Sequence, residues 1–127
     1  MVIGIDFDGT CVTHEFPLVG KGIGAERILK HLVAKGHQLV LFTMRSDNEE
    51  GDYLTDAVEW FKKRNIPLYG INTNPEQHLW TSSPKAYCQL YIDDCGLGIP
   101  LKKTNLSEKP YVDWLGVEYL LLNGGVL

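Results

Sequence analysis

Short apolar runs alternate with segments of helical periodicity over most of the chain. The first run is Val-Ile-Gly-Ile at residues 2–5, and similar runs cover 38–42, 68–71 and 89–92. Runs of this length, bounded by turn residues, are typical of strands buried on both faces. Between the first two runs the pattern predicts a helix that ends at Lys35-Gly36, and its apolar residues recur at helical spacing (Ala25, Ile28, Leu29, Leu32 and Val33).

The rest of the chain contains two more predicted helices and two long irregular segments. After a polar loop at 46–52, apolar residues on one stripe predict a helix that ends in the basic residues 62–64 (Leu54, Ala57, Val58 and Phe61). Residues 11–24 and 72–84 show no periodicity and are predicted to be loops. A short strand is expected at 111–112, followed by a helix that Asp113 caps and Gly124-Gly125 end.

The order of strand, helix and strand predicts parallel βαβ units. We therefore expect an α/β fold with an open parallel sheet and helices on both faces, which is a three-layer Rossmann-like arrangement. At 127 residues, without repeats or a low-complexity linker, residues 1–127 are expected to form a single domain.

Composition narrows the range of environments and partners. The formal net charge of -4 gives no basic field, so binding to nucleic acid is not indicated. No apolar stretch reaches membrane-spanning length, and the first residues are a strand rather than a cleavable signal. The 3 cysteines have no framework spacing, which indicates free thiols in a reducing compartment. We expect a cytoplasmic protein without membrane contact.

Polar side chains follow three of the predicted strands. Asp6 ends the first strand and Asp8 lies in the turn beyond it, Thr43 follows the second strand, and Asp93-Asp94 follow the fourth. In open parallel sheets, ligands bind beyond the carboxyl ends of the strands. Crowded carboxylates repel one another unless a positive charge lies between them, and a hard divalent cation is the usual one. The sequence therefore predicts a metal-assisted site at this edge of the sheet.

These residues also resemble a known family. Asp6-Phe7-Asp8-Gly9-Thr10, followed in order by Thr43, Lys85 and Asp93-Asp94, resembles the four motifs of the haloacid dehalogenase (HAD) superfamily, whose members are mostly Mg²⁺-dependent phosphatases. The resemblance covers residues 1 to about 98, and the first and fourth motifs together are its specific part. It implies a HAD-like hydrolase domain acting on a phosphorylated substrate, either a small molecule or a polymer end.

The resemblance also implies a role for each residue. Asp6 would be the nucleophile that forms an aspartyl-phosphate, and Asp8 the acid and base. Lys85 would offset the negative charge of the phosphoryl group, which Thr43 and the backbone of Met44 would hold. Thr10 would orient Asp8 near the substrate. Arg45 is either a substrate contact or an ordinary loop arginine.

Mg²⁺ is the cofactor that the resemblance implies. Its ligands would be the carboxylate of Asp6, the backbone carbonyl of Asp8 and a carboxylate of the last acidic pair. Asp94 is the favoured direct ligand, and Asp93 would lie around the metal or reach it through water. Water and substrate would complete the coordination, since Mg²⁺ tends to retain water.

Many HAD phosphatases carry a cap domain that recognises the substrate, but neither 11–42 nor 44–84 has room for one. A capless protein would have an open site, which a large substrate or a partner subunit of a homo-oligomer could cover. The loops 11–24 and 72–84, the latter with Trp80, are expected to form its rim. Two other functions stay open: a HAD-fold phosphotransferase and a non-catalytic phosphate-binding domain, although phosphate binding alone does not require Asp8.

Overall fold

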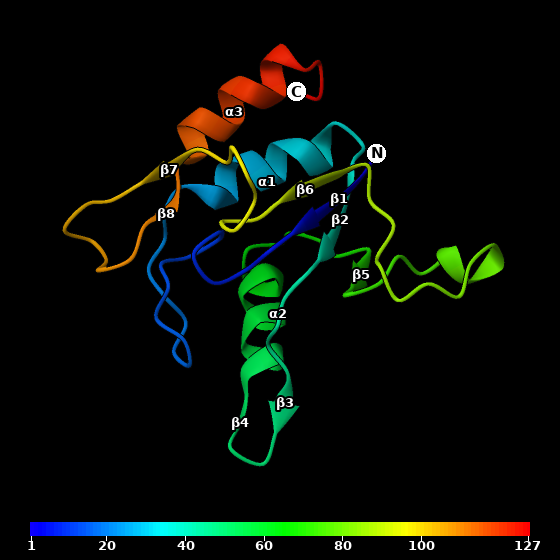
Figure 1. The fold of residues 1–127 in the computed structure, drawn as a ribbon, viewed down its shortest axis with the longest axis horizontal. Coiled ribbons are helices and arrows are strands. Elements are labelled where there is room, and N and C mark those ends of the chain that lie inside the picture. The colour runs from blue at the N-terminus through cyan, green and yellow to red at the C-terminus, as the bar shows by residue number, and fades with distance from the viewer.

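A sheet of four parallel strands forms the centre of the computed structural model, which describes residues 1–127. The strand order is β5-β2-β1-β6 (Figure 1). The strands are β1 (Val2–Ile5), β2 (Gln38–Leu41), β5 (Gly70–Ile71) and β6 (Leu90–Ile92). Ile5 pairs with Leu41 on one side and with Ile92 on the other. The carboxyl ends of β1, β2 and β6 therefore lie level with one another.

All three helices pack on one face of this sheet. They are α1 (Ala25–Ala34), α2 (Tyr53–Lys63) and α3 (Trp114–Asn123). Because side chains alternate along a strand, Ile3 and Ile5 point to one face, and the register places the side chains of Leu39, Leu41 and Ile92 beside them. These five residues belong to one hydrophobic cluster with the buried residues of all three helices (Ala25, Ile28, Leu29, Leu32, Ala57, Trp60, Phe61, Trp114, Val117 and Leu121).

The other face is covered by residues 72–89 instead of a helix. Gly4, Val40 and Gly70 lie in register on this face. A Cβ on Gly4 would come within 3.3 Å of the Cys88 sulfur, and a Cβ on Gly70 would collide with the backbone of Thr73. The segment therefore packs directly on backbone that bears no side chain. Its only helical part is the single turn η1 (Gln77–Leu79), so the expectation of helices on both faces is not met.

Two short hairpins complete the fold. One joins β3 (Asp47–Asn48) to β4 (Gly51–Asp52) just before α2, within a segment expected to be a loop. The other joins β7 (Leu101–Lys102) to β8 (Tyr111–Val112). The strand at 111–112 was expected, but it pairs antiparallel with β7 and lies outside the main sheet. None of the helices combines the length and the apolar character needed to cross a membrane.

The segments between Thr10 and Thr43 and between Thr43 and Lys85 contain no additional domain. The first holds an irregular loop, α1 and β2, and the second holds the β3–β4 hairpin, α2, β5 and η1. The expected helix at the end of the chain is present, with the Asp113 carboxylate accepting a hydrogen bond from the amide of Leu115 at its first turn.

Candidate active site

The carboxyl ends of β1, β2 and β6 open into one cleft of about 450 Å³. Its walls come from the residues after β1, the loop after β2 and the turn after β6, as the sequence predicted. The residues that line it are Asp6, Asp8, His14, Phe16, Thr43, Met44, Arg45, Asp93, Asp94 and Cys95. Of the nine predicted site residues, seven line the cleft, and only Thr10 and Lys85 are absent from its walls.

Asp6 lies partly buried at the floor of the cleft. Its amide donates to the carbonyl of Ile92 (3.0 Å), and its Oδ2 accepts a hydrogen bond from the Thr10 hydroxyl (2.7 Å). The pKa of Asp6 is raised to about 7, mainly by burial and also by the charges of Asp93 and Asp94, against the lowering effect of the Thr10 hydrogen bond. An ionised Asp6 at neutral pH therefore benefits from a nearby cation.

Thr10 orients Asp6 and not Asp8, which corrects the role expected for it. The residue is fully buried, so it does not contact substrate. Its hydroxyl donates to Asp6 and accepts a hydrogen bond from the amide of Asp94 (3.0 Å). A single hydroxyl thus joins the loop after β1 to the turn after β6, and fixes the distance between the two acidic motifs.

The C-terminal segment holds the same loop from the other side. The indole Nε1 of Trp114 donates to the carbonyl of Thr10 (2.7 Å), and the amide of Val112 donates to the carbonyl of Gly9 (2.9 Å). Trp114 is buried and Val112 is fully buried. Residues 111–114, which carry no motif, are therefore part of the support of the site.

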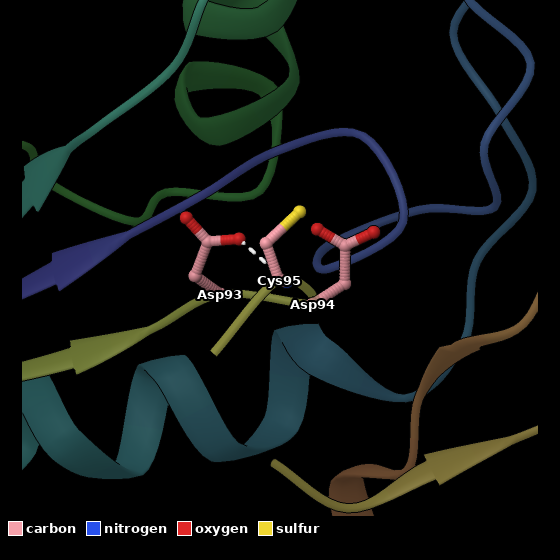
Figure 2. A group of neighbouring side chains, drawn as sticks. All are labelled: Asp93, Asp94 and Cys95. Atoms are coloured by element: carbon pink, nitrogen blue, oxygen red, sulfur yellow. Dashed lines mark hydrogen bonds between the residues drawn. The ribbon is translucent and has the colours of Figure 1, made fainter. Parts of the chain in front are cut away.

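Asp93, Asp94 and Cys95 form a cluster in the turn after β6, and their side chains project on the side where the loop after β1 runs (Figure 2). One oxygen of each carboxylate and the Cys95 Sγ all lie within 4.8 Å of one another. The Asp93 Oδ1 accepts a hydrogen bond from the Cys95 amide (2.9 Å). The charges of Asp94 and Asp93 raise the pKa of the Cys95 thiol, which keeps the sulfur protonated and leaves the carboxylates as the available ligands.

Gly9 allows the Asp94 carboxylate to approach the loop after β1. Gly9 has a φ of +80°, and a Cβ at this position would lie 2.5 Å from the Asp94 Oδ2. Both the left-handed conformation and the close approach therefore require glycine. Burial raises the pKa of Asp94 and Asp93 raises it as well, whereas a hydrogen bond with Asp6 lowers it.

The donor set fits a hard divalent cation. The carbonyl oxygens of Phe7, Gly9 and Thr10 each accept a hydrogen bond, whereas the carbonyl of Asp8 accepts none. Asp8, which bears this free carbonyl, lines the cleft together with Asp6 and Asp94. Oxygen ligands from carboxylates and a backbone carbonyl are those that Mg²⁺ prefers. Asp6, the Asp8 carbonyl and the Asp93-Asp94 pair could therefore hold such an ion.

Arg45 forms a bidentate ion pair with the side chain of Asp8. Its Nε donates to the Asp8 Oδ2 (2.7 Å) and its Nη2 to the Asp8 Oδ1 (2.8 Å). The arginine side chain is 1% exposed and that of Asp8 14%, so the pair is largely removed from solvent. Its remaining donors reach the carbonyls of Leu18 (2.9 Å) and Tyr53 (3.0 Å). Arg45 is therefore neither an ordinary loop arginine nor, in this conformation, free to contact a substrate.

The loop after β2 presents one unengaged backbone donor to the cleft. The amide of Thr43 donates to the side chain of Asn72 (2.8 Å), and the amide of Arg45 donates to the Thr43 Oγ1 (3.1 Å). The Met44 amide between them makes no hydrogen bond, and the Met44 side chain is almost fully exposed. Thr43 and Met44 thus lie at the rim, where the sequence predicted a phosphate contact.

Comparison with known proteins gives one solved relative. No family model and no curated protein matches the sequence. The structure is similar to that of a conserved protein from Bacteroides thetaiotaomicron, with 31% sequence identity and a TM-score of 0.72. This chain belongs to the same family as that conserved protein. The likeness covers 98% of this chain and 91% of that chain, so the family's α/β architecture extends through the C-terminal hairpin and α3.

Lys85 is not brought to the cleft, contrary to the role expected for it. It lies in the segment that covers the second face of the sheet, where its carbonyl accepts a hydrogen bond from the Gln77 side chain (2.8 Å). Its side chain is exposed and makes no ion pair within 4.0 Å. The buried cation of the cleft is Arg45 instead.

The loop at 72–84 does not form the rim of the cleft either. It leaves the site at Asn72 and turns back along the sheet, so that the amide of Gln89 reaches the carbonyl of Val2 at the far end of β1. In Figure 1 η1 projects to the right, away from the ends of β1 and β6. Trp80 is exposed and packs edge-on against Tyr87, with ring centroids 5.1 Å apart.

The loop at 11–24 does form one wall, through His14 and Phe16, as expected of that segment. Phe16 stacks on the Arg45 guanidinium, whose carbon lies 5.0 Å from the ring centroid, and packs edge-on against Tyr53. These individual residues could not be predicted from the sequence because the segment has no periodicity. Only its place directly after Thr10 indicated that it lies near the site.

Proposed function

We propose that this protein is a Mg²⁺-dependent phosphatase of the HAD superfamily, which hydrolyses a phosphate monoester through an aspartyl-phosphate on Asp6. The observation that carries the proposal is the meeting of Asp6, the free Asp8 carbonyl and the Asp93-Asp94 pair in one cleft. Parallel pairing alone would bring these strand ends together, but it would not require four carboxylates to line one cleft. Mg²⁺ would neutralise the charge of the carboxylates and of the phosphoryl oxygens.

Asp6 is placed to act as the nucleophile. The Thr10 hydroxyl holds its Oδ2, so the Oδ1 is the oxygen left to attack phosphorus. A bond forms between Oδ1 and phosphorus as the bond from phosphorus to the leaving oxygen breaks. Water then attacks the aspartyl-phosphate, which releases phosphate and regenerates Asp6.

Asp8 can serve as acid and base only after its ion pair with Arg45 opens. Both of its carboxylate oxygens accept hydrogen bonds from the guanidinium. Once released, Asp8 would donate a proton to the leaving oxygen and later take one from the attacking water. The freed guanidinium could then bind phosphoryl oxygens, which would supply the cation that the resemblance assigned to Lys85.

The same ion pair favours one alternative, a non-catalytic phosphate-binding domain. If the pair never opens, Asp8 has no catalytic role and the cleft can only bind. A phosphotransferase differs from a phosphatase only in the acceptor, which would be an alcohol in place of water.

A phosphate-release screen over many phosphate esters, with Mg²⁺ or with excess EDTA, tests the proposal. We expect release that depends on Mg²⁺ and is abolished in Asp6→Asn. Asp8→Asn should keep the nucleophile and lose mainly kcat. Phosphate release that persists in EDTA, or near-wild-type rates in both variants, would contradict the assignment. Binding of phosphate without turnover of any ester would identify the binding domain.

A further inference from the structure

A second cleft, of about 620 Å³, lies beside the candidate active site, and His14 lines both. Its walls come from the loop at 11–24 and from the loop that joins β7 to β8. Both loops lie on the left in Figure 1, at the carboxyl end of the sheet. We call this cleft the lysine groove, after Lys21, Lys103 and Lys109, which line it.

The two walls of the lysine groove are fixed against each other. The Lys21 Nζ donates to the carbonyl of Leu106 across the groove (3.0 Å), and the Lys21 amide donates to the Thr13 hydroxyl (2.8 Å). On the opposite wall, the hydroxyls of Thr104 and Tyr111 are hydrogen-bonded (2.7 Å). The groove is therefore built by contacts between loops and does not arise from one loop alone.

The cationic groups of the groove have no anionic partner within the protein. Glu15 and Glu108 also line it, but none of the three lysines makes an ion pair within 4.0 Å. Only one lining residue, Leu106, is apolar, which argues against an aromatic or lipid ligand. Ammonium groups whose only protein partners are neutral carbonyls, together with the side chains of Asn105 and Ser107, suit a ligand with several anionic oxygens.

The adjoining cleft lacks the charge that this groove supplies. Four carboxylates line the cleft (Asp6, Asp8, Asp93 and Asp94), and Asp8 already engages its guanidinium. A ligand with two phosphate groups would meet strong repulsion there unless the second group lay elsewhere. The lysine groove shares His14 with this cleft and supplies three cationic side chains beside it.

We propose that the lysine groove binds a second phosphate group of the substrate, so that the preferred substrates are phosphate monoesters whose leaving group carries another phosphate. The hydrolysis of the first phosphate group in this inference rests on the proposed phosphatase function. It assigns substrate choice to the loops at 11–24 and 103–110, and not to the segment at 72–84.

Matched substrates test the proposal. The α,ω-alkanediol bisphosphates of several chain lengths are compared with the monophosphates of the same diols, with Mg²⁺ at low ionic strength. We expect kcat/KM to favour the bisphosphate of the fitting length roughly three- to tenfold, as a few partly exposed ion pairs allow. The double variant Lys103→Gln/Lys109→Gln should reduce that preference to about two, the statistical factor for two equivalent phosphates, and high salt should do the same.

Lys62→Gln/Lys63→Gln is the control, since these exposed lysines lie at the end of α2, outside both clefts. It should keep the bisphosphate preference. A preference above the statistical factor that survives in Lys103→Gln/Lys109→Gln, or that is absent in the wild type at every chain length, overturns the proposal.

A binding measurement separates this proposal from the phosphatase proposal. Methylenebisphosphonate is titrated into the protein in EDTA, and the amide NMR signals of residues 103–109 are followed. Shifts that disappear in Lys103→Gln/Lys109→Gln, without hydrolysis of any ester, support the groove and reject the phosphatase. Hydrolysis of monoesters without shifts in these signals supports the phosphatase and rejects the groove.

Discussion

Arg45 connects three segments of the chain through one guanidinium. It binds Asp8 after β1, the carbonyl of Leu18 in the neighbouring loop and the carbonyl of Tyr53 at the start of α2. Its plane also lies over the ring of Phe7, 5.1 Å from the centroid. A buried guanidinium with this many partners fixes geometry as much as it balances charge.

Replacing Arg45 should therefore destabilise the protein strongly. Arg45→Met leaves the Asp8 carboxylate without its partner in a largely buried place, and we expect a loss of about 3–5 kcal/mol. The double variant Asp8→Asn/Arg45→Met should recover part of the loss because it removes the unpaired charge. Urea denaturation of EDTA-treated proteins measures both. If Arg45→Met alone unfolds at the wild-type urea concentration, the pair is not a structural support.

Gly9 offers a second test at this scale. Gly9→Ala introduces a side chain at a φ of +80° and 2.5 Å from the Asp94 Oδ2, so Asp94 must move. We expect weaker Mg²⁺ binding by at least tenfold, as loss of one positioned ligand contact implies, together with about 1–2 kcal/mol of lost stability. Isothermal titration with Mg²⁺ reports the first effect.

Gly36→Ala separates backbone strain from displacement of Asp94. Gly36 has a φ of +91°, but no atom lies within 4 Å of its Cβ position. It should lose similar stability and bind Mg²⁺ as the wild type does. Equal Mg²⁺ affinity in both variants would show that Asp94 tolerates displacement.

The sequence predicted where the acidic residues meet but not what each side chain contacts. Asp6, Thr43 and Asp93-Asp94 follow apolar strands, and parallel pairing brings such positions together whatever the loops do. The partner of Thr10 and the burial of Arg45 depend on how irregular segments fold over the strand ends. Spacing along the chain contains no information on that, which is why Thr10 was assigned to the wrong carboxylate.

At the scale of elements, α3 and the strand before it support a loop more than ninety residues earlier in the chain. Trp114 reaches the carbonyl of Thr10 and Val112 reaches that of Gly9. Asp8 directly precedes Gly9 in this loop, and the Thr10 hydroxyl holds Asp6. A substitution in α3 that alters these hydrogen bonds should therefore alter the position of Asp6 and Asp8 in the cleft.

Trp114→Phe tests this coupling. It keeps an aromatic ring in the core but removes the hydrogen bond to Thr10, and we expect a loss of about 1–2 kcal/mol of stability and a lower kcat. Trp60→Phe is the control, because Trp60 is also buried but its indole makes no hydrogen bond. Its stability should fall while kcat stays near the wild-type value. Urea denaturation and Mg²⁺-dependent phosphate release are the two measurements.

Trp80 leads to the opposite expectation. Because the segment at 72–84 lies along the second face of the sheet, Trp80→Ala should leave kcat/KM within about twofold of the wild type and cost only about 0.5–1.5 kcal/mol for the lost contact with Tyr87. A change in kcat/KM of tenfold or more on any ester would show that residues 72–84 take part in substrate binding.

The helices and main strands could be predicted because each has an apolar period that burial requires. The arrangement of layers could not. Residues 72–89 cross the sheet without a helical period, so nothing in the pattern says that they replace a helix on the second face. The glycines that make room for them, Gly4 and Gly70, occur within strands, where glycine alone does not indicate what packs on it.

At the scale of the whole molecule, the acidic cleft links stability to pH and to metal. The folded pKa of Asp6, about 7, lies above its ordinary value of 3.8. The folded protein therefore binds the Asp6 proton more tightly than the unfolded chain does. The resulting free energy of folding is fully present below pH 3.8 and is lost as the pH rises to about 7. The loss is on the order of a few kcal/mol.

We therefore expect the Tm of the protein in EDTA to fall between pH 5 and pH 8. Asp6→Asn should show a smaller fall, because it has no titrating group at this position. Saturating Mg²⁺ should raise the Tm more at pH 8 than at pH 5, since a cation favours the ionised carboxylate and adds stability by mass action. Differential scanning calorimetry across this range measures all three. A Tm in EDTA that rises with pH would contradict the assignment of Asp6 to a buried, repelled carboxyl.

The contacts from Val112 and Trp114 to the loop after β1 also set an order of events during synthesis. The ribosome makes Asp6 and Asp8 about a hundred residues before Val112 and Trp114, whose groups hold Gly9 and Thr10. Until then the nascent chain holds its acidic residues on an unclamped loop. The acidic residues after β1 are thus translated well before their loop can be held in place, so a nascent chain arrested before α3 should lack the metal affinity of the folded protein.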